Sequence, residues 1–135
     1  MAKPEHVELL RRDVDRWNQW REENPHTLPD LAGADLSYLD LTLANLAGAD
    51  LAAADFAMAN LRGADLRRAD LRAANLVGAR LIGVDLEGAD LRATDLRTAE
   101  DLTEEQLELA RGDAATVLPE GVARPAAWSA TKATP

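Results

Sequence analysis

The chain has 135 residues, of which 47% are hydrophobic and only 4% aromatic, with no cysteine and a formal net charge of −9. This composition suits a single domain with an aliphatic core, and it excludes disulfides, thiolate catalysis and zinc-cysteine sites. The longest stretch without a charged residue is nine residues, 41–49, and the N-terminal segment is charged, so neither a membrane span nor a signal peptide is expected. We therefore expect a cytoplasmic protein that binds neither membranes nor nucleic acid directly, because its negative charge disfavours both.

Residues 1–28 predict an N-terminal capping helix and a linker. Val7, Leu10, Val14 and Trp17 recur at three- and four-residue steps within residues 4–23, as they would along one face of a helix. Pro25 ends the pattern, because the residue before a proline disfavours the helical conformation. We expect this helix to cover the first turn of the domain that follows. An interaction surface formed by its tryptophans is the alternative.

Residues 29–98 form a five-residue repeat that never slips. The pentads have fourteen hydrophobic centres, thirteen of them leucine: Leu31, Leu36, Leu41, Leu46, Leu51, Phe56, Leu61, Leu66, Leu71, Leu76, Leu81, Leu86, Leu91 and Leu96. A step of five rotates ~140° around a helix, so the centres would scatter. On a straight strand they would alternate between two faces, and the flanking segments are too short to cover both. The chain must therefore bend once per pentad, forming a coil whose stacked turns are filled by the centres.

The other positions of the pentad also have physical roles. The residue two before the centre is small, alanine in ten of fourteen pentads, because the bend brings backbone close to the core. The residue just before the centre is Asp or Asn in thirteen pentads, with Arg80 as the exception, and we expect these side chains to accept backbone hydrogen bonds at the bend. No metal site is expected, because the carboxylates lie one per corner and do not converge.

The motif Ala-(Asp/Asn)-Leu-x-x, as in Ala64-Asp65-Leu66-Arg67-Arg68, resembles that of the pentapeptide-repeat proteins. The resemblance implies an all-β solenoid, a right-handed quadrilateral β-helix with four pentads per coil. Fourteen pentads would then make about 3.5 coils, with the N-terminal helix and a short C-terminal helix as caps.

Residues 99–135 predict a C-terminal capping helix and tail. The register slips at Leu102, so we expect the coil to stop near residue 98. Residues 103–106 form a capping box, flanked by Leu102 and Leu107 as a hydrophobic staple, which predicts a short helix to about residue 111.

The remainder resembles the C-terminal tail of bacterial pentapeptide-repeat proteins. Trp128 is expected to pack on the last coil, and residues 129–135 are expected to be disordered.

The sequence favours binding over catalysis. Neither histidine lies near the aspartates, no serine has an adjacent base, and no phosphate-cradling loop or metal-ligand spacing occurs. We expect a non-enzymatic protein without a cofactor, acting as an interaction or scaffold module for an unknown protein partner, as a monomer or weak homodimer.

The outward positions of the pentads provide a candidate interaction surface. Its members are three apolar residues and four arginines: Tyr38, Leu43, Met58, Arg62, Arg67, Arg68 and Arg72. Random variation on a solvent-exposed face is the alternative.

DNA mimicry is the second functional hypothesis. Some members of the family are acidic rods that bind DNA gyrase in place of duplex DNA and so protect against topoisomerase poisons. The coil predicted here would be only ~17 Å long, about five base pairs. Its eleven acidic residues are diluted by seven arginines, giving the repeat a net charge of −4. A mimic needs a continuous negative field, so we rank this hypothesis second.

Overall fold

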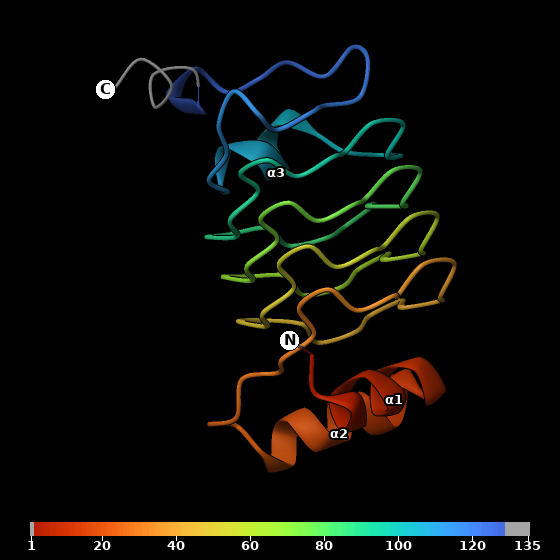
Figure 1. Ribbon diagram of the computed structural model, residues 1–135. Coiled ribbons are helices and arrows are strands. Elements are labelled where there is room, and N and C mark those ends of the chain that lie inside the picture. The colour runs from red at the N-terminus through yellow and green to blue at the C-terminus, as the bar shows by residue number, and fades with distance from the viewer. Residues whose placement is uncertain (1, 129–135) are drawn as a thin grey trace.

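The computed structural model describes residues 2–128, and the tail that we expected to be disordered lies outside them. The chain forms a stack of irregular loops, with helices α1 and α2 at one end and α3 near the other (Figure 1). Within the described residues, no helix is long and apolar enough to cross a membrane.

Each pentad contributes one side of a coil, and residues twenty positions apart lie over one another. Asp30 pairs with Asp50, Asp50 with Asp70 and Asp70 with Asp90 as parallel bridges, and the other sides repeat this pattern. The bridges are single pairs, and no continuous strand forms within residues 2–128. The reason is that a turn follows every centre and leaves too few extended residues for a longer ladder.

The twenty-residue pairing defines four sides and four corners. Sides 1 to 4 begin with the centres at residues 31, 36, 41 and 46, and each next coil adds twenty to these numbers. We name the corners by their first residue: the 33-corner (33, 53, 73, 93), the 38-corner (38, 58, 78, 98), the 43-corner (43, 63, 83) and the 48-corner (48, 68, 88).

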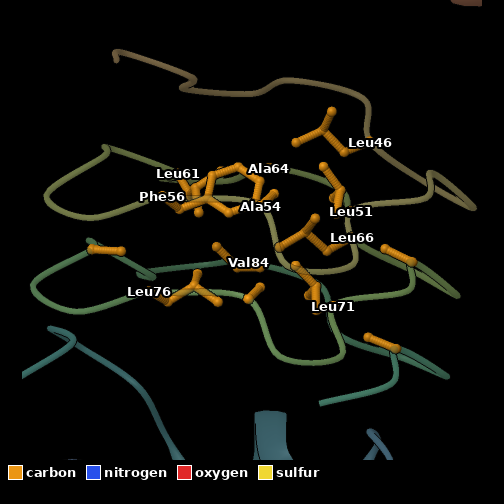
Figure 2. Close-up of a cluster of buried hydrophobic side chains, with 14 of the residues drawn as sticks. Leu46, Leu51, Ala54, Phe56, Leu61, Ala64, Leu66, Leu71, Leu76 and Val84 are labelled. Carbon is orange, nitrogen blue, oxygen red and sulfur yellow. The ribbon is translucent and has the colours of Figure 1, made fainter. Parts of the chain in front are cut away.

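The predicted core is the observed core. All fourteen centres are buried, none with more than 3% of its surface exposed. Most of the small residues two positions earlier are buried beside them, and Figure 2 shows leucines of successive coils stacked with Phe56 inside the loops.

Every centre opens a tight turn. The Ala34 N–H, for example, donates to the Leu31 carbonyl at 3.0 Å, and the residue between them at the corner, Gly33, has a φ of 71°. These are the marks of a type II turn, whose third residue needs a positive φ. All fourteen corner residues have a positive φ, including the eight that are not glycine.

The aspartates and asparagines before the centres support these turns as predicted. Asp65 Oδ1, for example, accepts the Arg67 N–H at 3.0 Å, and the same bond to the residue two positions on recurs around the coil. Arg80, the exception, instead forms an ion pair with Glu100 at 3.7 Å.

Two helices stand where we expected one. They are α1 (Pro4–Arg12) and α2 (Val14–Glu23), and the break lies at Asp13, whose backbone is extended at φ −163°. The Asp13 carboxylate accepts the backbone N–H groups of the first turn of α2, as an N-cap does. The break turns α2 so that Trp17, like Leu10 of α1, is buried against the first coil.

The capping box of α3 (Glu104–Glu108) is present as predicted, but two expectations about this region are wrong. The stacking continues past residue 98, because Arg111 pairs with Asp90 and Val117 with Asp95. The helix ends at Glu108 and does not reach residue 111, because residues 109–111 rejoin the coil. The residues of these two pairs are 21 and 22 positions apart, whereas those of the earlier pairs are 20 apart. Helix α3 takes the place of one pentad on side 4, and it accommodates the change of register at Leu102.

Candidate functional site

The N-terminal edge of the coil is occupied by the chain itself. A first coil has no preceding coil, so its outward N–H and C=O groups need other partners. On side 1, the Ala2 and Lys3 N–H groups donate to the first coil at 3.1 and 3.0 Å, and His6 Nδ1 accepts the Asp30 N–H at 3.0 Å. This part of the edge therefore offers no free main-chain ladder.

Side chains of α2 close the edge at side 4. Trp17 Nε1 and Arg21 Nη1 both donate to the Asn45 carbonyl, at 2.8 and 2.9 Å, and Arg21 Nη2 donates to the Ala47 carbonyl at 2.8 Å. Asn18 Oδ1 accepts the Asn45 N–H at 2.8 Å. These roles of Asn18 and Arg21 could not be predicted from the sequence, because their partners lie more than twenty residues away. Because the edge is covered on sides 1 and 4, the sides and corners of the coil are the larger surface left for a partner.

The apolar corner surface, defined as Tyr38, Leu43 and Met58, is highly exposed. The exposed fractions are 77%, 67% and 54%. Tyr38 and Met58 are stacked neighbours on the 38-corner, and Leu43 lies on the next corner across side 3. The structure therefore brings these three residues to one region of the first two coils.

All three residues hold an unfavourable backbone conformation. Their φ angles are 64°, 64° and 60°, in the left-handed region that other residues enter at a cost of ~1–2 kcal/mol each. Glycine occupies this position in six pentads at less conformational cost. The presence of large apolar residues at these strained corners therefore needs a physical reason.

Part of the explanation is contact with the next coil. Leu43 Cδ2 lies 2.8 Å from where a Cβ on Gly63 would stand, and Met58 Sδ lies close to the same point on Gly78. The glycines make room for the bulky residue of the coil before them. These contacts cover only part of each side chain, since more than half of each remains exposed.

Three of the four arginines of the predicted surface lie away from the apolar corner surface, and two of these, Arg67 and Arg72, form ion pairs with aspartates. Arg67 is on side 4, Arg68 on the 48-corner and Arg72 on side 1, so only Arg62, on side 3, adjoins the apolar corner surface. The structure thus divides the seven predicted residues into one group around side 3 and a second group around the 48-corner.

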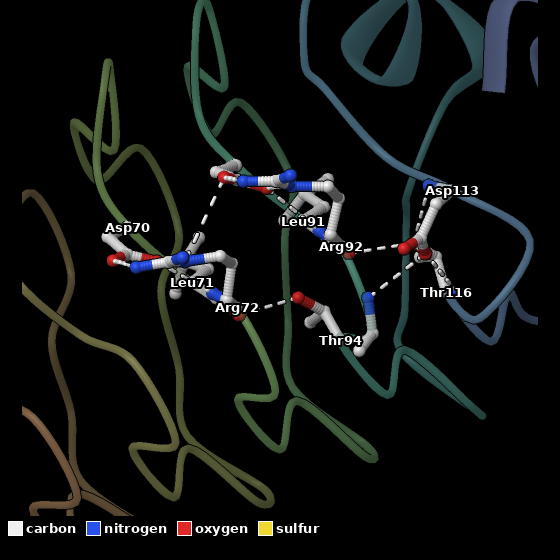
Figure 3. Close-up of polar contacts among 10 residues, drawn as sticks. Asp70, Leu71, Arg72, Leu91, Arg92, Thr94, Asp113 and Thr116 are labelled. Atoms are coloured by element: carbon white, nitrogen blue, oxygen red, sulfur yellow. Dashed lines mark hydrogen bonds and ion pairs between the residues drawn. The ribbon is translucent and has the colours of Figure 1, made fainter. Parts of the chain in front are cut away.

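The paired arginines neutralise the aspartate columns. Arg72 Nη2 donates to Asp70 at 2.7 Å, and its Nε lies 3.9 Å from Asp90. Figure 3 shows the Arg72 side chain beside Asp70. Side-chain hydrogen bonds from Arg72 and Arg67 hold the pKa of Asp70 and of Asp65 below the usual range. On side 1, the guanidinium of Arg72 therefore lies between the like charges of Asp70 and Asp90, which gives this arginine a structural role.

No group of three or more His, Cys, Asp or Glu side chains within residues 2–128 is arranged to hold a metal ion. The carboxylates are spaced along the coil, one to a turn, and each accepts backbone hydrogen bonds there.

Repeated pentads, four-sided coils and buried leucine columns define a solenoid of stacked turns. The family model for pentapeptide repeats matches residues 30–68 and 64–99 in eight copies, over half of the chain. The chain belongs to the pentapeptide repeat family. Members of this family form right-handed quadrilateral β-helices, the class predicted from the motif.

Solved structures of this family are similar to the chain. A pentapeptide repeat protein from the Arabidopsis thaliana thylakoid lumen is 28% identical, with a TM-score of 0.52, and the match covers 70% of this chain and 60% of that one. One from Nostoc is 35% identical, with a TM-score of 0.45 and coverage of 72% and 75%. One from the cyanobacterium Cyanothece is 33% identical, with a TM-score of 0.34 and coverage of 67% and 64%. A comparison with curated protein sequences gave no match.

Proposed function

We propose that the protein is a non-enzymatic interaction module that binds a protein partner through the apolar corner surface. The observation that carries this proposal is the combination of exposure and backbone conformation at Tyr38, Leu43 and Met58. These are corner positions at which glycine would be less strained, and each exposes more than half of a large apolar side chain.

The scaffold suits this role. It is a stack of about 3.5 coils of pentads that continues through residues 111–117. Helices α1 and α2 act as the cap at its N-terminal end, and the segment that follows α3 and ends at the buried Trp128 acts as the cap at the other end. The caps prevent edge-to-edge pairing between copies, so that contacts are made by the lateral surface. A rigid stack needs little ordering when it binds, which lowers the entropic cost of association.

DNA mimicry ranks below this proposal. On sides 1 and 4 the carboxylates bind arginines of the same or the next coil, so the surface alternates in charge. A substitute for duplex DNA needs an unbroken row of negative charge.

The test compares capture of partners by the native chain and by the triple variant Tyr38→Asn/Leu43→Asn/Met58→Asn. Asparagine tolerates a positive φ, so the variant removes apolar surface without new backbone strain. The matched control is Ala53→Asn/Ala73→Asn/Ala93→Asn on the 33-corner, where the backbone is the same and no large side chain is lost. A partner captured by the native chain and the control, and lost from the triple variant, supports the proposal.

Two results would contradict it. Equal capture by all three proteins would mean that the corner is not the binding surface. Inhibition of purified DNA gyrase in a supercoiling assay by both the native chain and the triple variant would instead favour DNA mimicry.

A further inference from the structure

A groove of about 510 Å³ lies between the last coil and the segment that carries α3. Ile82, Val84 and Leu86 line it on the side of the coil, and Asp101 and Leu109 line it on the side of α3. It lies at the 43-corner, two coils beyond Leu43, and is separate from the apolar corner surface.

The groove is open because its corner residue is glycine. Gly83 has a φ of 70°, and the atoms nearest to where its Cβ would stand belong to the Gly63 backbone, at 3.8 Å. No side chain of the preceding coil covers this corner, unlike the glycines beneath Leu43 and Met58. Gln106 holds α3 over the opening, because its Nε2 donates to the Leu81 and Val84 carbonyls at 3.0 Å.

The walls of the groove expose large apolar side chains. Ile82 is 44% exposed and Leu109 is 56% exposed. Leu109 is held in place by its main chain, whose carbonyl accepts the Gly88 N–H at 2.8 Å. Both walls are therefore fixed before anything binds.

The charges around the groove are negative. Asp85 and Asp101 line it, and Glu104 and Glu105 follow on α3. Arg67 Nε lies 3.8 Å from Asp85, whereas Asp101, Glu104 and Glu105 form no salt bridge with any residue that the structure describes. An apolar slot with a negative rim complements a ligand that is apolar at its centre and positive around it.

We propose that this groove docks a basic amphipathic segment of a partner protein. An apolar side chain of the segment enters between Ile82 and Leu109, and lysine or arginine residues on either side of it lie beside Asp85 and Asp101. The pairing of a buried apolar anchor with a charged rim is how peptide-binding grooves combine affinity with selectivity.

The test titrates the full chain into a fluorescein-labelled peptide of alternating Leu-Leu and Lys-Lys pairs, followed by fluorescence anisotropy at physiological ionic strength. We expect saturable binding with a Kd of about 10–50 μM. Ile82→Ser/Leu109→Ser and Asp85→Asn/Asp101→Asn are each expected to weaken it about fivefold or more. Asparagine can keep the turn bond that Asp85 accepts from the Glu87 N–H, as it does at motif positions elsewhere in the coil, and it tolerates the positive φ of Asp101.

Matched variants control for net charge and for general apolar adhesion. Asp35→Asn/Asp50→Asn removes two carboxylates of the same motif position far from the groove, and Tyr38→Asn/Met58→Asn removes apolar surface from the 38-corner. Both are expected to change the Kd by less than about twofold, and thermal unfolding checks that every variant is folded.

Three outcomes would overturn the proposal. They are the lack of saturable binding below about 200 μM, equal weakening by the two carboxylate pairs, and loss of binding in Tyr38→Asn/Met58→Asn alone. The last result would show that the peptide binds the apolar corner surface. It would therefore refute binding in the groove and leave the proposed function intact.

Discussion

Replacing Leu66 by alanine tests whether the main-chain ladder holds the coils rigidly apart. Leu66 is fully buried, between Leu46 and Leu86 in the interior column of side 4. The Leu46 N–H donates to the Asp65 carbonyl at 2.8 Å, and the Leu66 N–H donates to the Asp85 carbonyl at 2.9 Å. Because these bonds fix the spacing on both sides, the void left by the substitution has little freedom to close.

The expected magnitude follows from that rigidity. Buried Leu→Ala substitutions cost ~2.7–5.0 kcal/mol, and the cost rises with the cavity that remains. We expect about 4 kcal/mol for Leu66→Ala. With an unfolding entropy of ~2.1 cal/mol/K per residue, a chain of 135 residues would lose about 14 °C in Tm.

The assay is urea unfolding followed by circular dichroism and by tryptophan fluorescence, with a thermal scan in parallel. Coincident curves would show that the stack unfolds as one unit. Leu28→Ala is the control, because Leu28 is 66% exposed and should cost less than about 1 kcal/mol. A loss below about 2 kcal/mol for Leu66→Ala would refute the reasoning, since it would mean that neighbouring coils move together to fill the void.

Three further substitutions probe the ends and the ion pairs. Gly112→Ala places a Cβ against ring atoms of the buried Trp128, so we expect a loss of ~1–3 kcal/mol and altered tryptophan emission; unchanged emission would contradict this packing. Burial lowers the pKa of His6 from 6.5, so the stability linked to its neutral form is complete above pH 6.5 and declines as the pH falls through that value. In His6→Asn, the asparagine could still accept the Asp30 N–H but does not titrate. The urea midpoint should therefore change less between about pH 7 and 5 than in the native chain, and an equal change would contradict this role of His6. The side-chain hydrogen bond from Arg72 lowers the pKa of Asp70, so the stabilisation from this carboxylate is lost as the pH falls below ~3.9. Arg72→Gln should reduce the fall in urea midpoint between about pH 5 and 2.5, and an equal fall would show that the pairing is unimportant.

The candidate surface was only partly predictable. Exposure of Tyr38, Leu43 and Met58 follows from their position in the pentad, because that position always lies at a corner. These three residues lie around one side, and Arg67 lies on another, because four pentads complete a coil. The five-residue period alone does not give that number. The groove beside Gly83 could not be foreseen, since it depends on how α3 sits over the last coil.

The five-residue period by itself determined the bend after each centre and the buried leucine columns, and the residue types of the motif indicated the family. One pentad contains its own turn, its own supporting side chain and its own core residue, so these features are local and readable in order. Only the tertiary structure decided what happens where the repeat begins and ends. Asn18 and Arg21 bind an edge that lies more than twenty residues away, and the slip at Leu102 is absorbed by a helix so that stacking resumes at Arg111. Such contacts join residues that are distant in the chain, and their energy depends on geometry that no local pattern records.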